Sequence, residues 1–201
     1  MTEAPEPPFV SVIVPVFNDE RRIETCVKAL LAQTYPHDCY EVIVVDNGST
    51  DATREVVGRH PVVLLSETQM RGSYAARNTG LRHARGEIIA FTDSDCTPVA
   101  KWIAEGVHAI QAGADLVGGN VRFVFSPRPT GAEIRDAMAN LRIERYIRED
   151  GAAATANLFV RASVFAAIGT FPNNMVSGGD ILFTQRATGA GYSLEIGRAH
   201  V

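Results

Sequence analysis

Four short apolar runs, separated by stretches with helical periodicity, constrain the fold of this chain more than any other feature. The runs are rich in β-branched residues and show little apolar–polar alternation, which is typical of strands buried on both faces of a sheet. They occupy Val10–Phe17, Tyr40–Asp46, Val62–Leu65 and Glu87–Thr92. Helices are predicted between them, at about residues 23–31, 51–58 and 72–84. This alternation predicts an α/β fold with a parallel sheet built from right-handed βαβ units.

The second half of the chain has a less regular pattern. It predicts strands at about residues 115–125 and 155–160, and helices at 99–111, 131–148, 162–168 and 178–190. We therefore expect a smaller, mixed region beside the parallel sheet. The 201 residues suffice for one ordinary domain with a substantial core. Residues 1–8 contain Glu and Pro in place of a targeting pattern and are predicted to form a short disordered tail.

Two carboxylates, Asp93 and Asp95, follow the fourth predicted strand with one residue between them. Residues i and i+2 of a strand share a face, so both carboxylates are expected to point the same way. At roughly 5 Å and an effective dielectric near 20 their repulsion is about 3 kcal/mol. A divalent cation such as Mg²⁺ would remove this cost, and it usually completes its shell with waters and substrate phosphates. The alternative is a solvated turn, because Asp and Ser are common turn residues.

Composition limits the classes of partner and the compartment. The net charge of −4 and the pI of about 5.7 give no bulk attraction to nucleic acid. Three cysteines without a CxxC pair indicate neither a disulfide framework nor a zinc site, so a reducing cytoplasm is expected. No apolar run approaches the roughly 20 residues that span a bilayer, which leaves peripheral membrane association open.

Four segments of the chain together carry a family resemblance: Val12–Asn18, Val44–Asp51, Ala76–Gly80 and Asp93-Ser94-Asp95. In this order they resemble the motifs of the GT-A-fold family 2 glycosyltransferases, and the likeness extends over about residues 9–195. It implies a GT-A, Rossmann-like fold and inverting transfer of a sugar from a nucleotide-diphosphate sugar to an acceptor hydroxyl. It also implies Mg²⁺ or Mn²⁺ as cofactor. Residues 9–98 would then form the nucleotide-sugar-binding half and residues 99–195 the acceptor-binding and catalytic half.

The resemblance also implies roles for residues at the strand ends. Pro15 and Phe17 would line the base pocket, with Phe17 standing where the family commonly has Tyr. Asp46 would accept a hydrogen bond from the base. The alternatives are that Phe17 belongs to the core and that Asp46 caps the turn that follows it.

The remaining donor-side roles fall on a basic residue and the acidic pair. Asp93 would face the ribose and the metal, and Asp95 would bind the metal. Arg77, in an Ala-Arg-Asn segment, would hold the carboxylate or phosphate geometry of the site. The alternative is that Arg77 is an ordinary surface arginine of a helix.

A later segment, Ser177–Phe183, resembles the acidic motif that carries the catalytic base of the family. Gly179 replaces the usual Glu, and Leu182 stands where a second acidic residue is common. Asp180 is retained near a predicted helix N-terminus, where negative charge is favoured. Asp180 is therefore our candidate for the base that takes the acceptor proton. An ordinary helix cap is the alternative.

Two other functions fit part of this pattern. Because the acidic motif near Asp180 is depleted, the chain could be a non-catalytic nucleotide-sugar-binding module. A nucleotidyltransferase also combines a nucleotide pocket with paired aspartates. It usually has a glycine-rich basic loop after the first strand, whereas this chain has Phe17-Asn18-Asp19-Glu20 there. The acceptor is an unknown glycan, lipid or other hydroxyl compound.

The last residues carry a separate expectation. Ile196–Val201 resemble the translation of a sequencing-library adapter, so residues 196–201 are suspected to be a non-native scar that cuts a final strand short. Under the competing interpretation, His200 is a metal ligand, because a histidine after this strand can complete the metal site in GT-A enzymes. Because we prefer the scar interpretation, we leave His200 out of the predicted site.

Overall fold

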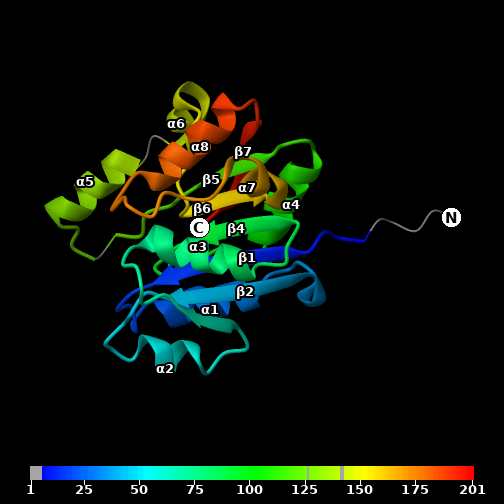
Figure 1. Cartoon of the computed structure of the whole chain (residues 1–201). Coiled ribbons are helices and arrows are strands. Elements are labelled where there is room, and N and C mark those ends of the chain that lie inside the picture. Colours follow the sequence, from blue (N-terminus) through cyan, green and yellow to red (C-terminus); the bar gives the residue numbers. More distant parts are fainter. Residues whose placement is uncertain (1–5, 126, 141–142) are drawn as a thin grey trace.

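The computed structural model describes residues 6–125, 127–140 and 143–201, and it contains one seven-stranded sheet with helices on both faces (Figure 1). The strand order is β3-β2-β1-β4-β6-β5-β7. The predicted α/β architecture with a mostly parallel sheet is confirmed. The strands are β1 Val10–Val16, β2 Tyr40–Asp46, β3 Val63–Ser66, β4 Ile88–Thr92, β5 Leu116–Asn120, β6 Asn157–Arg161 and β7 Leu194–His200.

The parallel half of the sheet places three strand ends at one edge. Strand β1 pairs in parallel with both β2 and β4, and β2 pairs in parallel with β3. Parallel neighbours need crossover connections, which are supplied mainly by helices. These are α1 Ile23–Leu31, α2 Thr53–Val57 and α3 Ser73–His83, and a short 3₁₀ turn, η1 His37–Cys39, precedes β2. The carboxyl ends of β1, β2 and β4 therefore meet.

The other half is mixed, as the sequence predicted. Strand β6 runs antiparallel to β4 and β5, and β7 is parallel to β5. The helices here are α4 Trp102–Gln111, α5 Gly131–Asn140, α6 Ile143–Asp150, α7 Ala162–Ile168 and α8 Gly179–Gly189. The longest described helices, α3 and α8, have 11 residues, and none of the described helices is long and apolar enough to cross a membrane.

Three boundary predictions need correction or fall outside the described residues. The helix predicted over 131–148 is two helices, α5 and α6, and its predicted apolar position Leu141 lies outside the described residues. The strand predicted over 115–125 ends at Asn120, because β5 has strand partners only up to that residue. Most of the tail predicted over residues 1–8, namely residues 1–5, also lies outside the described part of the chain.

The final strand includes most of the residues that are suspected to be a scar. Strand β7 has seven residues and pairs with β5 from Leu194 to His200, with a register shift near its end. Val201 is only 8% exposed and packs into the core. Residues 196–201 thus take part in the sheet, whereas the suspicion that they are a scar stays a prediction.

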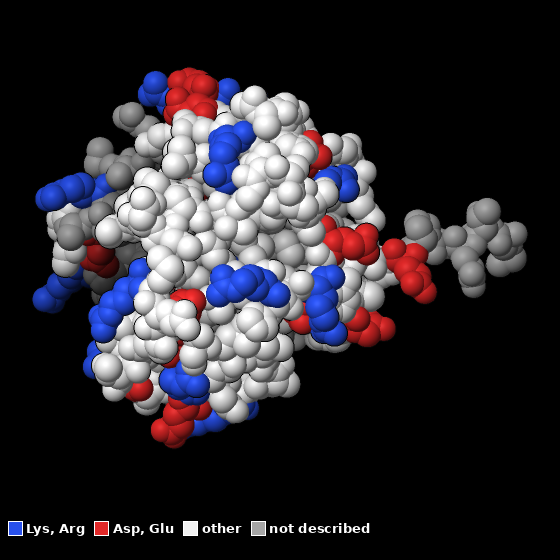
Figure 2. All heavy atoms as spheres, in the orientation of Figure 1, with Lys and Arg blue, Asp and Glu red and all other residues white. Residues whose placement is uncertain are grey.

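Apolar side chains form one core layer on each face of the sheet, whereas Lys, Arg, Asp and Glu side chains are spread over the surface drawn in Figure 2. The first layer joins alternate residues of β1, such as Val12 and Val14, to α1 and α4, and the second joins Ile13 to α3, α7 and α8. Alternation along a strand explains this division, because successive side chains point to opposite faces. At Gly106 of α4 an added Cβ would lie 2.4 Å from the Phe159 ring, so this helix approaches the sheet closely. The two layers hold the strand ends that carry the site.

Candidate nucleotide-sugar site

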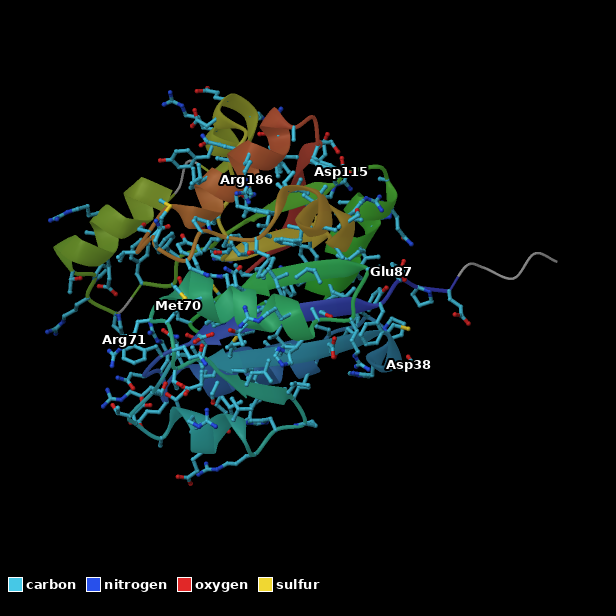
Figure 3. All side chains as sticks on the ribbon, viewed as in Figure 1. Asp38, Met70, Arg71, Glu87, Asp115 and Arg186 are labelled. Atoms are coloured by element: carbon cyan, nitrogen blue, oxygen red, sulfur yellow. The ribbon has the colours of Figure 1, made fainter. Side chains whose placement is uncertain are left out.

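A cavity of about 470 Å³ lies at the carboxyl ends of the parallel strands. Five of the seven predicted site residues line it, while Asp46 and Asp180 lie outside the lining set. In Figure 3, Arg71, a further lining residue, lies at the opposite end of the sheet from Glu87, which precedes β4. Ligands of open α/β sheets bind at this edge. The lining residues are Pro15, Val16, Phe17, Asn47, Arg71, Gly72, Ser73, Arg77, Asp93, Ser94 and Asp95.

Arg77 and Asp93 form an ion pair in the wall of the cavity. Arg77 lies on α3 and is only 3% exposed, and its Nη2 donates to Asp93 Oδ1 at 2.5 Å. Burial raises the pKa of Asp93 above its usual range, Arg77 acts to lower it, and the charge of Asp95 raises it further. The surface alternative for Arg77 does not apply, because its guanidinium is buried. Its Nε has no hydrogen-bond partner among the described residues and remains a free donor.

Asp95 is the exposed member of the acidic pair, and its chemistry fits a hard cation. Arg77 uses one oxygen of Asp93, and Arg22 Nη1 donates to Asp95 Oδ2 at 3.2 Å. The second oxygen of Asp93 stays open to a metal, and that of Asp95 receives only a weak contact from Cys96 Sγ, at 4.0 Å. The described residues contain no group of three or more His, Cys, Asp or Glu that could hold an ion. This two-carboxylate set fits Mg²⁺ or Mn²⁺ that takes its other ligands from water and substrate phosphates.

The mouth of the cavity carries an aromatic ring opposite a basic side chain. Phe17 is 49% exposed, and the Arg71 guanidinium carbon lies 6.0 Å from its ring centroid. The core alternative for Phe17 does not apply, since half of its surface reaches solvent. An open ring of this kind can stack on a nucleobase.

Asp46 caps the turn that follows it, which was the alternative to contact with the base. It is 1% exposed, its carboxylate accepts from the backbone N–H of Ser49, and Arg54 Nη1 lies 3.2 Å from Oδ2. Its neighbour Asn47 lines the cavity instead. The Asn47 amide donates to the carbonyls of Glu67 and Met70. Contact between Asp46 and a base therefore stays a prediction.

Asp180 lies at the start of α8 and outside the cavity lining. Its Oδ1 accepts from Tyr74 Oη at 2.8 Å and from the N–H of Ile181 at 3.0 Å. Its Oδ2 accepts from the backbone and the hydroxyl of Thr155, at 3.0 and 3.3 Å. The charge of Asp180 contributes to the raised pKa of Asp93, so the two carboxylates are close enough to interact.

Sequence reasoning missed several residues that shape the site. Gly72, at φ +123°, donates its N–H to Asn47 Oδ1 at 2.7 Å, a conformation that favours glycine. A sequence signal existed for Asn47, because this residue directly follows the strand that ends at Asp46. Asp19 and Ser94 were also missed, although the buried Asp19 accepts from Ser94 Oγ at 2.6 Å. No local sequence pattern predicts the hydrogen bond between Asp19 and Ser94, because the two residues are 75 positions apart.

The family assignment rests on a match over most of the chain. The family model described as glycosyl transferase family 2 matches residues 11–169, which span β1 to α7 and include the whole cavity lining. The chain belongs to glycosyl transferase family 2. A curated member, glycosyltransferase AglE of Haloferax volcanii, is 47% identical over 193 residues. The alignment covers 93% of this chain and 64% of that protein, so the chain spans just under two thirds of its relative's length.

Solved structures of similar proteins agree with this family 2 assignment and confirm the predicted GT-A fold. A mannosyltransferase from Pyrobaculum calidifontis, solved in complex with GDP-Man and Mn²⁺, is 29% identical, with a TM-score of 0.73. The match covers 96% of this chain and 58% of that one. S. aureus TarS 1-349, solved in complex with UDP, is 22% identical, with a TM-score of 0.73. The match covers 96% of this chain and 60% of the TarS chain, and at this identity it supports the fold alone.

Proposed function

We propose that the chain binds a nucleotide-diphosphate sugar and transfers the sugar, with inversion, to an acceptor hydroxyl. The observation that carries the proposal is the convergence of Pro15, Phe17, Arg77, Asp93 and Asp95 on one cavity. The mannosyltransferase neighbour supports it, since its structure holds GDP-Man and Mn²⁺. In this proposal residues 9–98 bind the donor, and residues 99–195 bind the acceptor and supply the base.

The donor half has the groups that a nucleoside diphosphate needs. The Phe17 ring would stack on the base beside Arg71. Mg²⁺ or Mn²⁺ bound by Asp93 and Asp95 would neutralise the charge that develops on the departing diphosphate. Arg77 fixes one oxygen of Asp93, and as a cation in the cavity wall it would also favour the charge of the diphosphate.

Asp180 is the proposed base for the acceptor. A carboxylate within hydrogen-bond reach of the attacking hydroxyl can take its proton, and attack opposite the leaving group gives inversion. Both oxygens of Asp180 already accept two hydrogen bonds each, from Tyr74, Ile181 and Thr155. The hydroxyl of Tyr74 or Thr155 must therefore turn away to make room for the acceptor.

One observation favours a second function, a non-catalytic nucleotide-sugar-binding module. A carboxylate has about four lone-pair sites, and all four of Asp180 are used within the protein. Such a residue could simply link α3 to α8. This alternative predicts donor binding without turnover.

A panel of UDP- and GDP-sugars, each with and without Mn²⁺, tests both functions. We expect calorimetry to show metal-dependent binding of at least one nucleotide-sugar, and chromatography to show slow release of its nucleoside diphosphate. Asp95→Asn should abolish the metal dependence while leaving the fold intact. Binding that is equally tight in EDTA would contradict the metal site. Binding without any release or transfer would favour the non-catalytic module.

A further inference from the structure

Asp19 is a buried carboxylate beside the acidic pair for which the proposed transfer has no role. It is 6% exposed and accepts two short hydrogen bonds, from Ser94 Oγ and from Arg22 Nε, each at 2.6 Å. Ser94 is the residue between Asp93 and Asp95. Asp19 therefore ties the loop after β1 to the loop that carries the acidic pair.

The position of Asp19 is fixed by the turn after β2. Its N–H donates to Thr53 Oγ1 at 2.8 Å, and the preceding residue, Asn18, accepts from the N–H of Thr50 at 2.8 Å. Asn18 has φ +48°, a left-handed conformation that Asn adopts more readily than most other non-glycine residues. The anchor for Arg22 is thus set by three neighbouring segments and does not depend on a ligand.

Arg22 reaches from this anchor to the metal ligand. Its Nε binds Asp19, and its Nη1 lies 3.2 Å from Asp95 Oδ2. The Arg22 side chain is 62% exposed and that of Asp95 is 48% exposed, so the contact with Asp95 can open without disturbing the core. Asp19, in contrast, is buried, and it holds the other side of the Arg22 guanidinium.

We propose that Arg22 is an internal counter-ion that competes with the divalent cation for Asp95, and that Asp19 positions it. A guanidinium and a metal ion are both positive, so occupation of Asp95 by one disfavours the other. Without donor, Arg22 offsets the repulsion between Asp93 and Asp95. With metal and diphosphate bound, Arg22 leaves Asp95 and remains attached to Asp19. The inference rests on the proposed metal site at Asp95.

Titration with Mn²⁺ alone tests this inference, with free Mn²⁺ followed by electron paramagnetic resonance. Arg22→Gln removes the competing charge and is expected to tighten Mn²⁺ binding about three- to tenfold. Arg21→Gln is the matched control, because it removes the same charge from the exposed neighbouring residue. It should change the affinity less than twofold. A purely structural role for Arg22 would weaken Mn²⁺ binding and would not tighten it.

The outcomes separate failure of this inference from failure of the proposed function. Mn²⁺ affinity that is unchanged or lower in Arg22→Gln, or raised equally in Arg21→Gln, overturns the role of Arg22 alone. Asp95→Asn should abolish the tighter binding in the Arg22→Gln background. If neither wild type nor Arg22→Gln shows Mn²⁺ binding that depends on Asp95, the proposed metal site itself is wrong, and the inference falls with it.

Discussion

Gly179→Ala is expected to destabilise the protein even though alanine is the better helix former. A Cβ at Gly179 would lie 2.8 to 3.0 Å from three atoms of the Tyr74 ring. Tyr74 is only 5% exposed. Its ring centroid lies 5.9 Å from that of Phe171 and 5.5 Å from the guanidinium carbon of Arg77, so the ring has little room to move. Any side chain at residue 179 would therefore have to displace the Tyr74 ring.

The magnitude follows from two opposing terms. Overpacking a buried contact costs about 1–3 kcal/mol, and displacement of Tyr74 also weakens its hydrogen bond to Asp180. The gain in helix propensity is at most about 1 kcal/mol and is smaller at the first residue of a helix. We therefore expect a net loss of about 1–3 kcal/mol. With a urea m-value of about 2 kcal/mol/M, the unfolding midpoint falls by roughly 0.5–1.5 M.

Urea unfolding followed by circular dichroism measures this loss, and α8 supplies its own control. Gly189, the last residue of the helix, is exposed, and an added Cβ would meet nothing within 4 Å. Gly189→Ala should be neutral or slightly stabilising. Tyr74→Phe separates the loss of the hydrogen bond to Asp180 from the overpacking, because it keeps the ring and removes only the hydroxyl. If Gly179→Ala is as stable as Gly189→Ala, the packing argument is refuted.

Three further predictions concern the base, the core and acid stability. Asp180→Asn should lower transfer 10²- to 10⁴-fold and leave nucleoside diphosphate affinity nearly unchanged in calorimetry, and near-full transfer would exclude the base role. Gly106→Ala places a Cβ 2.4 Å from the Phe159 ring and should cost about 1–3 kcal/mol by urea unfolding, whereas an unchanged midpoint would mean that α4 can shift freely. The hydrogen bond from Thr79 lowers the pKa of Glu67, so its contribution is fully present above the unfolded pKa of about 4.3 and is lost as the pH falls through the lower folded value. Unfolding midpoints between pH 6 and pH 3 should therefore fall less steeply in Glu67→Gln than in wild type, and identical slopes would contradict this assignment.

The parallel half of the sheet could be predicted closely because its strands are short, apolar and buried on both faces. Both ends of β2, Tyr40 and Asp46, were predicted correctly. The predicted start of β4 differs from the observed one by a single residue. Because β1 and β4 were predicted to be parallel, the polar residues that follow them were expected to meet at one edge of the sheet. Phe17, Asp93 and Asp95 could therefore be expected to share one site, and they line one cavity.

The second half of the chain was predicted less well, because its element boundaries are not visible in the apolar pattern. The apolar spacing over 131–148 is helical throughout, so nothing in it separated α5 from α6. The end of β5 at Asn120 depends on where its neighbours β6 and β7 lie. Strand length here is decided by pairing partners, which a single segment does not specify.

The sequence by itself determined the class of fold and the edge of the sheet that carries the site, since both follow from apolar runs and from residues next to them in the chain. Only the tertiary structure decided which partner each polar side chain takes. It turned Asp46 toward Arg54, joined Tyr74 to Asp180 across 106 positions, and joined Arg22 to Asp95 across 73. The physical reason is that a carboxylate accepts from whichever donors the packed helices bring within about 3 Å, and these donors come from distant segments of the chain.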